Sequence, residues 1–145
     1  MRVTSTLLSA LLSIMHPEQY QMGLTCIRQL PLHCNDVVAL DLWYSLFNGV
    51  QIISNRETPV HRDNGTSSPW MDLLATVGPY TTATFTLPGV GVKLQYGSGT
   101  VIGVCGRLLR HFVEDVDGER ICVAYYMRAN VQARVQVPPA GWSRI

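Results

Sequence analysis

The sequence predicts a mainly β domain with helices at its start, and three observations support that class. Apolar residues recur at helical spacing near the N-terminus, short apolar runs alternate with turn residues from Gly49 onward, and the chain contains no low-complexity tract. With 145 residues, 47% of them hydrophobic, the chain can bury the core of one domain. We therefore expect a single domain over 1–145, made of a helical support (1–47), a β-core (48–136) and an irregular tail (137–145).

Two helices are expected between residues 5 and 30. The apolar positions of the first recur at helical spacing: Leu7, Leu8, Leu11, Leu12 and Met15. The pair His16-Pro17 interrupts this pattern, and proline suits the first position of a second helix, which Pro31 then ends. The apolar start slightly resembles a signal peptide, but no A-x-A cleavage site follows, so we expect an amphipathic helix in a protein that is not secreted.

From Gly49 onward the pattern indicates about eight short strands. Besides an extended segment at 61–63, they are expected at 50–53, 71–77, 83–87, 92–96, 100–105, 108–113 and 120–127. Turn residues such as Gly78-Pro79 and Asp117-Gly118 separate them. Many short strands with this punctuation are typical of a sandwich or a barrel, and a jelly roll is one closed arrangement of them.

Composition limits the possible partners. The net charge is only +1, so the chain lacks the strongly basic balance of a self-sufficient nucleic-acid binder, although Arg107, Arg110, Arg128 and Arg134 could still form a local basic patch. The four cysteines form no CxxC pair, which indicates reduced thiols of an intracellular protein. No segment approaches the roughly 20 apolar residues of a membrane span, and the small size and modest charge favour a monomer.

The most informative residues are two histidines and an aspartate: His61, Asp63 and, fifty positions later, His111. Two imidazoles and one carboxylate are the ligand set that binds non-haem Fe(II) on one face and leaves the opposite face open for a 2-oxo acid and O2. Residues two apart on an extended strand point the same way, so His61 and Asp63 can share one ion, with His111 arriving from another strand. Arg120 could pair bidentately with a carboxylate co-substrate.

The same residues also allow interpretations without a metal. His61 could cap a turn, and His111 could be a surface histidine in the basic stretch 107–111. Arg120 could be the ion-pair partner of the nearby Asp117 or Glu119. Spacing alone leaves these alternatives open.

Three segments resemble a known family. They are NRETPVHRD at 55–63, PWMDLL at 69–74 and RICVAYY at 120–126. In this order and spacing they resemble the TET/JBP group of nucleic-acid-modifying dioxygenases, in the expanded form found in mushroom-forming fungi, over roughly residues 40–130. The resemblance implies a double-stranded β-helix, a jelly-roll or cupin-like fold. It also implies that Fe(II), 2-oxoglutarate and O2 are used to oxidise a methyl group on a flipped base, most often 5-methylcytosine in DNA.

The resemblance implies roles for single residues near the metal. His61, Asp63 and His111 would be the iron ligands of the catalytic centre, and Arg120 would bind the distal carboxylate of 2-oxoglutarate. Cys122 stands where relatives often carry a serine that touches the same carboxylate, and a thiol is the poorer hydrogen-bond donor.

On the substrate side the resemblance points to four further residues. Tyr126 stands where relatives place an aromatic that stacks on the extruded base, and Arg128 stands where several carry a histidine that reads cytosine. Tyr125 and Tyr126 are consecutive, so only one of them faces inward on a strand, and that one could simply belong to the core. Asn55 and Arg56 either position the loop before the iron ligands or only end a strand.

The main hypothesis from the sequence is therefore a DNA methyl-base dioxygenase that works in the nucleus or elsewhere inside the cell, a location inferred from the substrate class. Two alternatives stay open. The same chemistry could act on RNA or on a protein side chain. A compact or truncated copy of the fold could also bind its partner without turnover.

Overall fold

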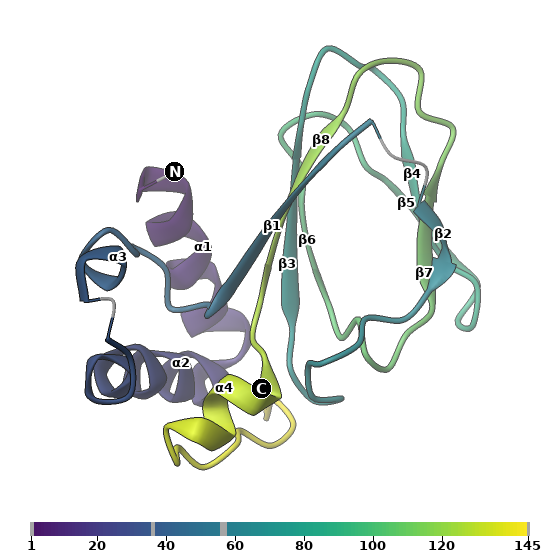
Figure 1. The fold of residues 1–145 in the computed structure, drawn as a ribbon. Helices are drawn as coiled ribbons and strands as arrows, with labels where there is room; N and C mark the ends of the chain where they lie inside the picture. The colour runs from purple at the N-terminus through teal and green to yellow at the C-terminus, as the bar shows by residue number, and fades with distance from the viewer. Residues whose placement is uncertain (1, 36, 56–57, 145) are drawn as a thin grey trace.

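The computed structural model describes residues 2–35, 37–55 and 58–144 and shows two four-stranded antiparallel sheets packed face to face (Figure 1). The first sheet has the spatial order β1 (Gly49–Ser54), β8 (Ile121–Tyr126), β3 (Asp72–Val77) and β6 (Val101–Val104). The second has the order β2 (Thr58–His61), β7 (His111–Glu114), β4 (Thr84–Leu87) and β5 (Val92–Gln95). Every connection except β4 to β5 crosses from one sheet to the other, as in a jelly roll. The predicted mainly β fold is confirmed.

Helices precede the first strand and follow the last. They are α1 (Arg2–Met15), α2 (Pro17–Gln29), the 3-10 turn η1 (Leu30–Leu32), α3 (Val37–Asp41) and α4 (Ala129–Arg134). The predicted break between the first two is confirmed: Nδ1 of His16 accepts a hydrogen bond from the Gln19 backbone N–H at 3.3 Å, which caps α2, and Pro17 begins that helix. None of the described helices is long and apolar enough to cross a membrane.

The helices α1 and α2 lie against the outer face of the first sheet, on the side away from the second sheet (Figure 1). The buried core between them consists of Leu8, Leu12, Met22, Leu46, Phe47, Trp70, Leu73, Tyr125 and Met127. The Gln19 side chain, fully buried, accepts from the Met71 backbone N–H at 2.7 Å and donates to the Met71 carbonyl at 2.9 Å. Helix α2 thereby fixes the point at which β3 begins.

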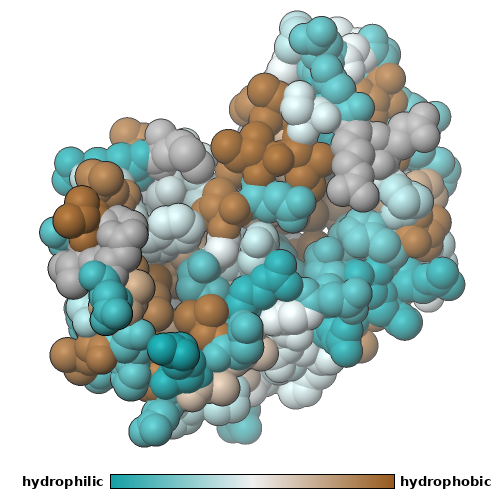
Figure 2. All heavy atoms as spheres, viewed as in Figure 1, coloured by the Kyte–Doolittle hydropathy of each residue, from teal (hydrophilic) through white to brown (hydrophobic). Residues whose placement is uncertain are grey.

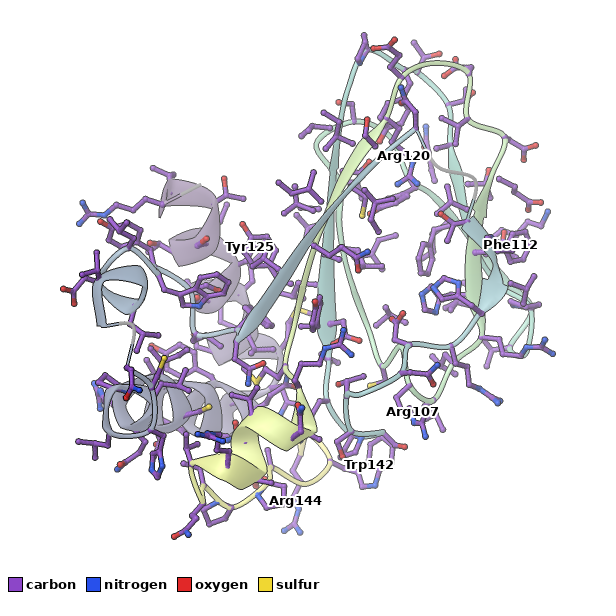
Figure 3. All side chains as sticks on the ribbon, viewed as in Figure 1. Arg107, Phe112, Arg120, Tyr125, Trp142 and Arg144 are labelled. Atoms are coloured by element: carbon purple, nitrogen blue, oxygen red, sulfur yellow. The ribbon has the colours of Figure 1, made fainter. Side chains whose placement is uncertain are left out.

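Alternation along the strands decides which side chains face the space between the sheets. On β8, Tyr125 packs against the helices (Figure 3), whereas Cys122 and Tyr126 line that space. A second buried core fills part of the space, with Tyr80, Ala83, Phe85, Tyr96, Ile102 and Val104. The remaining part is an open cavity bordered by both sheets.

Two local differences from the sequence-based expectation have physical causes. Residues 129–134 form α4 although they lie inside the range expected to be β; two alanines, a glutamine and an arginine in this segment favour a helix. The strand expected at 108–113 begins only at His111, because the backbone N–H groups of Leu108 and Leu109 both donate to the Cys105 carbonyl and close a turn.

Candidate metal centre and its cavity

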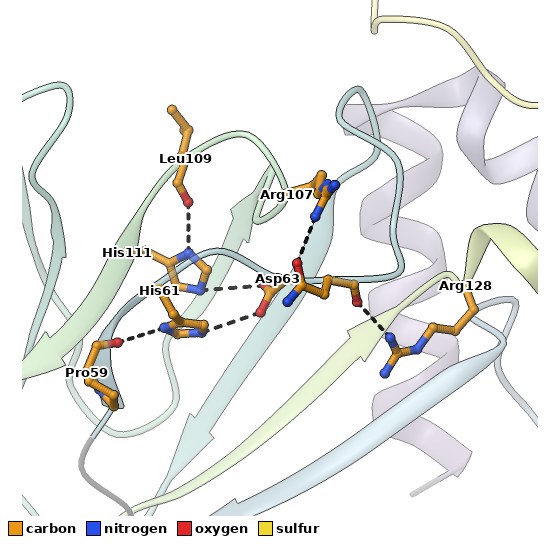
Figure 4. A network of polar contacts seen from close by, with 8 residues as sticks. Pro59, His61, Asp63, Arg107, Leu109, His111 and Arg128 are labelled. Carbon is orange, nitrogen blue, oxygen red and sulfur yellow. Dashed lines mark hydrogen bonds and ion pairs between the residues drawn. The ribbon is translucent and has the colours of Figure 1, made fainter.

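Two neighbouring strands bring together the three residues predicted to hold a metal. His61 ends β2, His111 begins β7, and the two are cross-strand partners. Asp63 follows two residues after His61. Nε2 of His61 lies 3.4 Å from one Asp63 carboxylate oxygen and Nε2 of His111 lies 3.6 Å from the other (Figure 4). One ligand atom from each residue of this triad (His61, Asp63 and His111) lies within 4.8 Å of the other two.

The hydrogen bonds of the two rings make the triad suited to a cation. Nδ1 of His61 lies 2.8 Å from the Pro59 carbonyl, and Nδ1 of His111 lies 3.0 Å from the Leu109 carbonyl (Figure 4). A carbonyl oxygen only accepts, so each Nδ1 carries a proton; in this tautomer of the ring, Nε2 presents its lone pair to Asp63. Two lone pairs facing a carboxylate repel unless a cation lies between them. A divalent metal therefore fits this donor set, and the carbonyls act as orienting partners.

The surroundings of the triad keep it in place and leave one side open. The His111 side chain is 4% exposed and stacks on the Phe85 ring with a centroid distance of 5.5 Å. The side chains of His61 and Asp63 are about a third exposed, at 36% and 34%. The backbone N–H of Asp63 donates to the Gly106 carbonyl at 3.0 Å, and a Cβ atom on Gly106 would collide with the Asp63 carboxylate. The glycine thus makes room for the ligand.

The triad lies in a cavity of about 300 Å³ between the two sheets. Seven of the residues predicted for the site line it: His61, Asp63, His111, Arg120, Cys122, Tyr126 and Arg128. Asn55 does not line it, and Arg56 lies outside the described residues. The structure therefore collects both the predicted metal ligands and most of the predicted binding residues around one space.

Arg120 lies toward one end of the space between the sheets (Figure 3). It is 4% exposed, its guanidinium lies 5.7 Å from the Tyr96 ring centroid, and its Nη1 has no hydrogen-bond partner among the described residues. The alternative pairing with Asp117 does not occur, since that carboxylate instead accepts from the backbone N–H groups of Thr81 and Thr82, each at 2.9 Å. A buried guanidinium without an acceptor is costly, so this end is built for an anion.

Neighbouring residues hold this anion-binding end. The Asn55 side chain accepts from the Arg120 backbone N–H at 2.7 Å, and its own backbone N–H donates to the Arg120 carbonyl at 2.8 Å. Sγ of Cys122 lies 3.7 Å from the Tyr96 hydroxyl, which donates to the Leu74 carbonyl at 3.1 Å. Burial, with a smaller contribution from Cys122, raises the pKa of Tyr96 far above its usual range, so the phenol stays protonated.

The residues Tyr126, Arg128 and Asp72 line another part of the cavity. The Arg128 guanidinium lies 4.7 Å from the Tyr126 ring centroid, and its Nη1 donates to the Asn64 carbonyl at 2.7 Å (Figure 4). Asp72 is 1% exposed, and neither carboxylate oxygen has a hydrogen-bond partner among the described residues. Burial, reinforced by the charge of Asp63 and opposed by that of Arg128, raises the pKa of Asp72 to about 8.

Among the lining residues to which the sequence analysis assigned no role, three have polar contacts or burial that shape the cavity: Asp72, Tyr96 and Asn64. The one available signal was for Asp72, an acidic residue at the start of an apolar run that continues through Leu73 and Leu74. For Tyr96 and Asn64 the sequence contained no such signal, because their contacts in the cavity depend on which distant segments pack together.

A jelly roll that holds a His-x-Asp…His triad and a buried arginine in one cavity defines the class of 2-oxoglutarate- and Fe(II)-dependent oxygenases. Residues 1–129 match the model of the Tet/JBP family, described as the oxygenase domain of the 2OGFeDO superfamily. The chain belongs to this family and is an oxygenase domain whose superfamily uses Fe(II), 2-oxoglutarate and O2. No curated protein matches the chain.

Proposed function

We propose that this domain oxidises a methyl group on a nucleic-acid base, of the 5-methylcytosine type in DNA, with His61, Asp63 and His111 as its iron ligands. The observation that carries the proposal is the arrangement of the cavity: the triad shares it with a buried arginine and with an aromatic ring, Tyr126. These are the parts needed for a metal, an anionic co-substrate and a flat base.

A bound Fe(II) would supply the redox chemistry that couples decarboxylation of 2-oxoglutarate to oxidation of a C–H bond. The chain's own residues would bind and orient the reactants. Arg120 would bind the distal carboxylate of 2-oxoglutarate, because its buried Nη1 lacks an acceptor among the described residues. Cys122, whose Sγ lies beside the Tyr96 hydroxyl at the edge of the same cavity, would contact that carboxylate weakly.

The size of the cavity favours a flipped base. A volume of about 300 Å³ is at the small end of the range for ligand pockets, so a duplex cannot enter but a single extruded base can reach inside. Tyr126 would stack on that base. In the structure Arg128 lies over the Tyr126 ring, so stacking on that face requires the guanidinium to move aside.

Arginines outside the cavity supply a surface for phosphates. Arg62, Arg107 and Arg110 line a depression that also contains His61 and Asn64, both of which line the cavity itself. No ion pair involves these three arginines within the described part of the chain. Hydrophilic side chains gather over this part of the molecule (Figure 2). Arginines at such a rim would contact the backbone of a nucleic acid whose base enters the cavity.

In the test, the Fe(II)-loaded protein is incubated with 2-oxoglutarate and O2 and with equal amounts of 5-methylcytosine DNA, methylated RNA or a methylated peptide, and succinate and oxidised product are measured by mass spectrometry. We expect oxidised product from the DNA. Product only from RNA or peptide would assign the substrate to that class, and absence of succinate with every substrate in folded protein would favour a binding module without turnover.

Salt dependence tests the arginine rim separately. Each phosphate contact contributes roughly 0.7–0.9 to the slope of log affinity against log salt, so Arg62→Gln, Arg107→Gln and Arg110→Gln together should lower the slope by about two or more. Arg28→Gln, on the exposed side of α2, is the matched control and should leave it unchanged. An unchanged slope in the triple variant would remove this rim from the binding surface.

A nucleic-acid substrate would also place the protein in the nucleus or elsewhere inside the cell, and we propose that it acts as a monomer. Fractionation of cells that express a tagged copy tests the location. Size-exclusion chromatography with light scattering tests the oligomeric state.

A further inference from the structure

Asp72 is the buried polar side chain of the cavity that the proposed mechanism does not use. It begins β3, is 1% exposed, and has both carboxylate oxygens without a hydrogen-bond partner among the described residues. Buried polar groups are nearly always hydrogen-bonded, and an orphaned one costs free energy. Because Asp72 lines the cavity, a donor supplied by a ligand is the natural partner for it.

The position of Asp72 relates it to the base rather than to 2-oxoglutarate. In the register of β3 and β8, Leu73 lies opposite Tyr125, so the next cross-strand position brings Asp72 and Tyr126 together. Both side chains line the cavity, and such neighbours have Cβ atoms roughly 4.5–5.5 Å apart. Arg120 immediately precedes the opposite end of β8. A base stacked on Tyr126 would therefore present its polar edge near Asp72.

Asp72 is also held in a fixed place. Gln19 binds both backbone groups of Met71, the residue before Asp72. Asp72 itself is the cross-strand partner of Val104 on β6. A Cβ atom on Gly106 would lie 2.9 Å from the Asp72 carboxylate, so the absence of a side chain there leaves room for it. The charged groups facing Asp72 are Asp63 and Arg128, and Arg128 is bound to the Asn64 carbonyl rather than to Asp72. Such a fixed acceptor is suited to recognition.

We propose that Asp72 reads the exocyclic amino group of the target base, and that the domain therefore prefers 5-methylcytosine to thymine. This inference rests on the proposed function. A carboxyl oxygen accepts a hydrogen bond whether or not the group is protonated, and the amino group of cytosine is a donor. Thymine also carries a methyl group at C5 but presents a carbonyl oxygen at the position of that amino group, so this oxygen and the ionised Asp72 carboxylate would be two acceptors facing each other.

The test uses two single-stranded oligonucleotides that differ at one position, which holds either 5-methylcytosine or thymine. All remaining thymines are replaced by uracil, so that thymine occurs only at the tested position. Binding is measured by anisotropy at pH 9, where the Asp72 carboxyl group is ionised, without O2 and with Fe(II) and 2-oxoglutarate bound; oxidation is then measured by mass spectrometry. We expect wild type to prefer 5-methylcytosine by roughly tenfold or more, the discrimination typical of one base contact. In Asp72→Asn the amide can donate to the thymine carbonyl. The ratio of 5-methylcytosine to thymine should therefore fall toward one for both binding and oxidation.

Controls separate recognition from folding and from turnover. Asp41→Asn makes the same chemical change at an exposed residue of α3 and should keep the wild-type preference. Asp72→Leu removes the acceptor with an apolar side chain and should also lose the preference, which keeps the test valid if Asp72→Asn fails to fold. Succinate formed by Asp41→Asn without any oligonucleotide should equal that formed by wild type.

The outcomes distinguish this inference from the function on which it rests. Oxidation of 5-methylcytosine with an unchanged preference in Asp72→Asn would overturn the role of Asp72 and leave the proposed function standing. A wild-type preference for thymine would likewise overturn it. If wild type oxidises neither base, the proposed function fails and the role of Asp72 fails with it.

Discussion

The buried carboxyl group of Asp72 should destabilise the metal-free protein in a pH-dependent way. Burial raises its pKa from 3.8 to about 8, so at pH 7 the folded state holds a proton that the unfolded chain has released. Each pH unit above 3.8 contributes about 1.4 kcal/mol to this difference, which gives an upper limit on the order of 4 kcal/mol at pH 7. Asp72→Asn removes the titration and keeps the shape of the side chain.

The sign follows from the direction of the shift. Below about pH 4 the carboxyl group is protonated in both states and the penalty is absent; it grows as the pH rises and levels off above about pH 8. The stability of Asp72→Asn relative to wild type should therefore increase from pH 4 to pH 8. The gain should stay below the upper limit, because a buried amide without partners costs roughly 1–3 kcal/mol itself.

Thermal unfolding of chelator-treated protein between pH 4.5 and pH 8 measures this difference. For a domain near this size each kcal/mol shifts the melting temperature by about 2–4 °C, so a gain of even half the limit is easily resolved. Asp41→Asn, exposed on α3, is the control and should follow wild type at every pH. Parallel curves for wild type and Asp72→Asn would contradict this prediction, because they would mean that the carboxyl group has the same pKa in the folded and unfolded states.

Three further predictions concern binding and the core. Arg120→Ala should raise the KM for 2-oxoglutarate by roughly 10–100-fold in steady-state assays, since a charge-assisted contact is lost; an unchanged KM would remove Arg120 from the co-substrate site. Gly106→Ala should weaken Fe(II) binding in anaerobic calorimetry, because its methyl group collides with the Asp63 carboxylate; wild-type affinity would contradict that geometry. Phe47→Ala should lower the free energy of unfolding by about 3–5 kcal/mol in urea, since Phe47 is fully buried against Tyr125; a loss below 1 kcal/mol would argue against this core.

Local patterns predicted the elements because their signals lie within a few residues. His16-Pro17 marked the boundary between two helices, and turn residues marked the ends of most strands. The helix at 129–134 was not predicted, because its six residues are too few to show a helical period. The late start of β7 depends on a turn around Cys105, for which the apolar pattern gave no sign.

The part of the candidate site that lies within one short motif was predictable from the sequence. The part that depends on how distant segments pack was not. The spacing of His61 and Asp63 suggested a shared ligand position, but only the pairing of β2 with β7 brings His111 to them. Alternation required one of Tyr125 and Tyr126 to face the cavity, yet the choice depends on which face of the sheet the helices cover. Asp72 could not be predicted from a motif either, because the burial of its carboxylate without a hydrogen-bond partner is a property of the folded chain.

A single-turnover measurement tests most directly whether the triad holds the iron that oxidises the base. Wild type and Asp63→Ala are mixed without O2 with Fe(II), 2-oxoglutarate and a 5-methylcytosine oligonucleotide; O2 is then admitted, and succinate and oxidised base are quantified together. We expect equal amounts of succinate and oxidised base from wild type and neither from Asp63→Ala, because the carboxylate faces both imidazoles of the triad. Oxidised base from folded Asp63→Ala at the wild-type level would contradict this expectation.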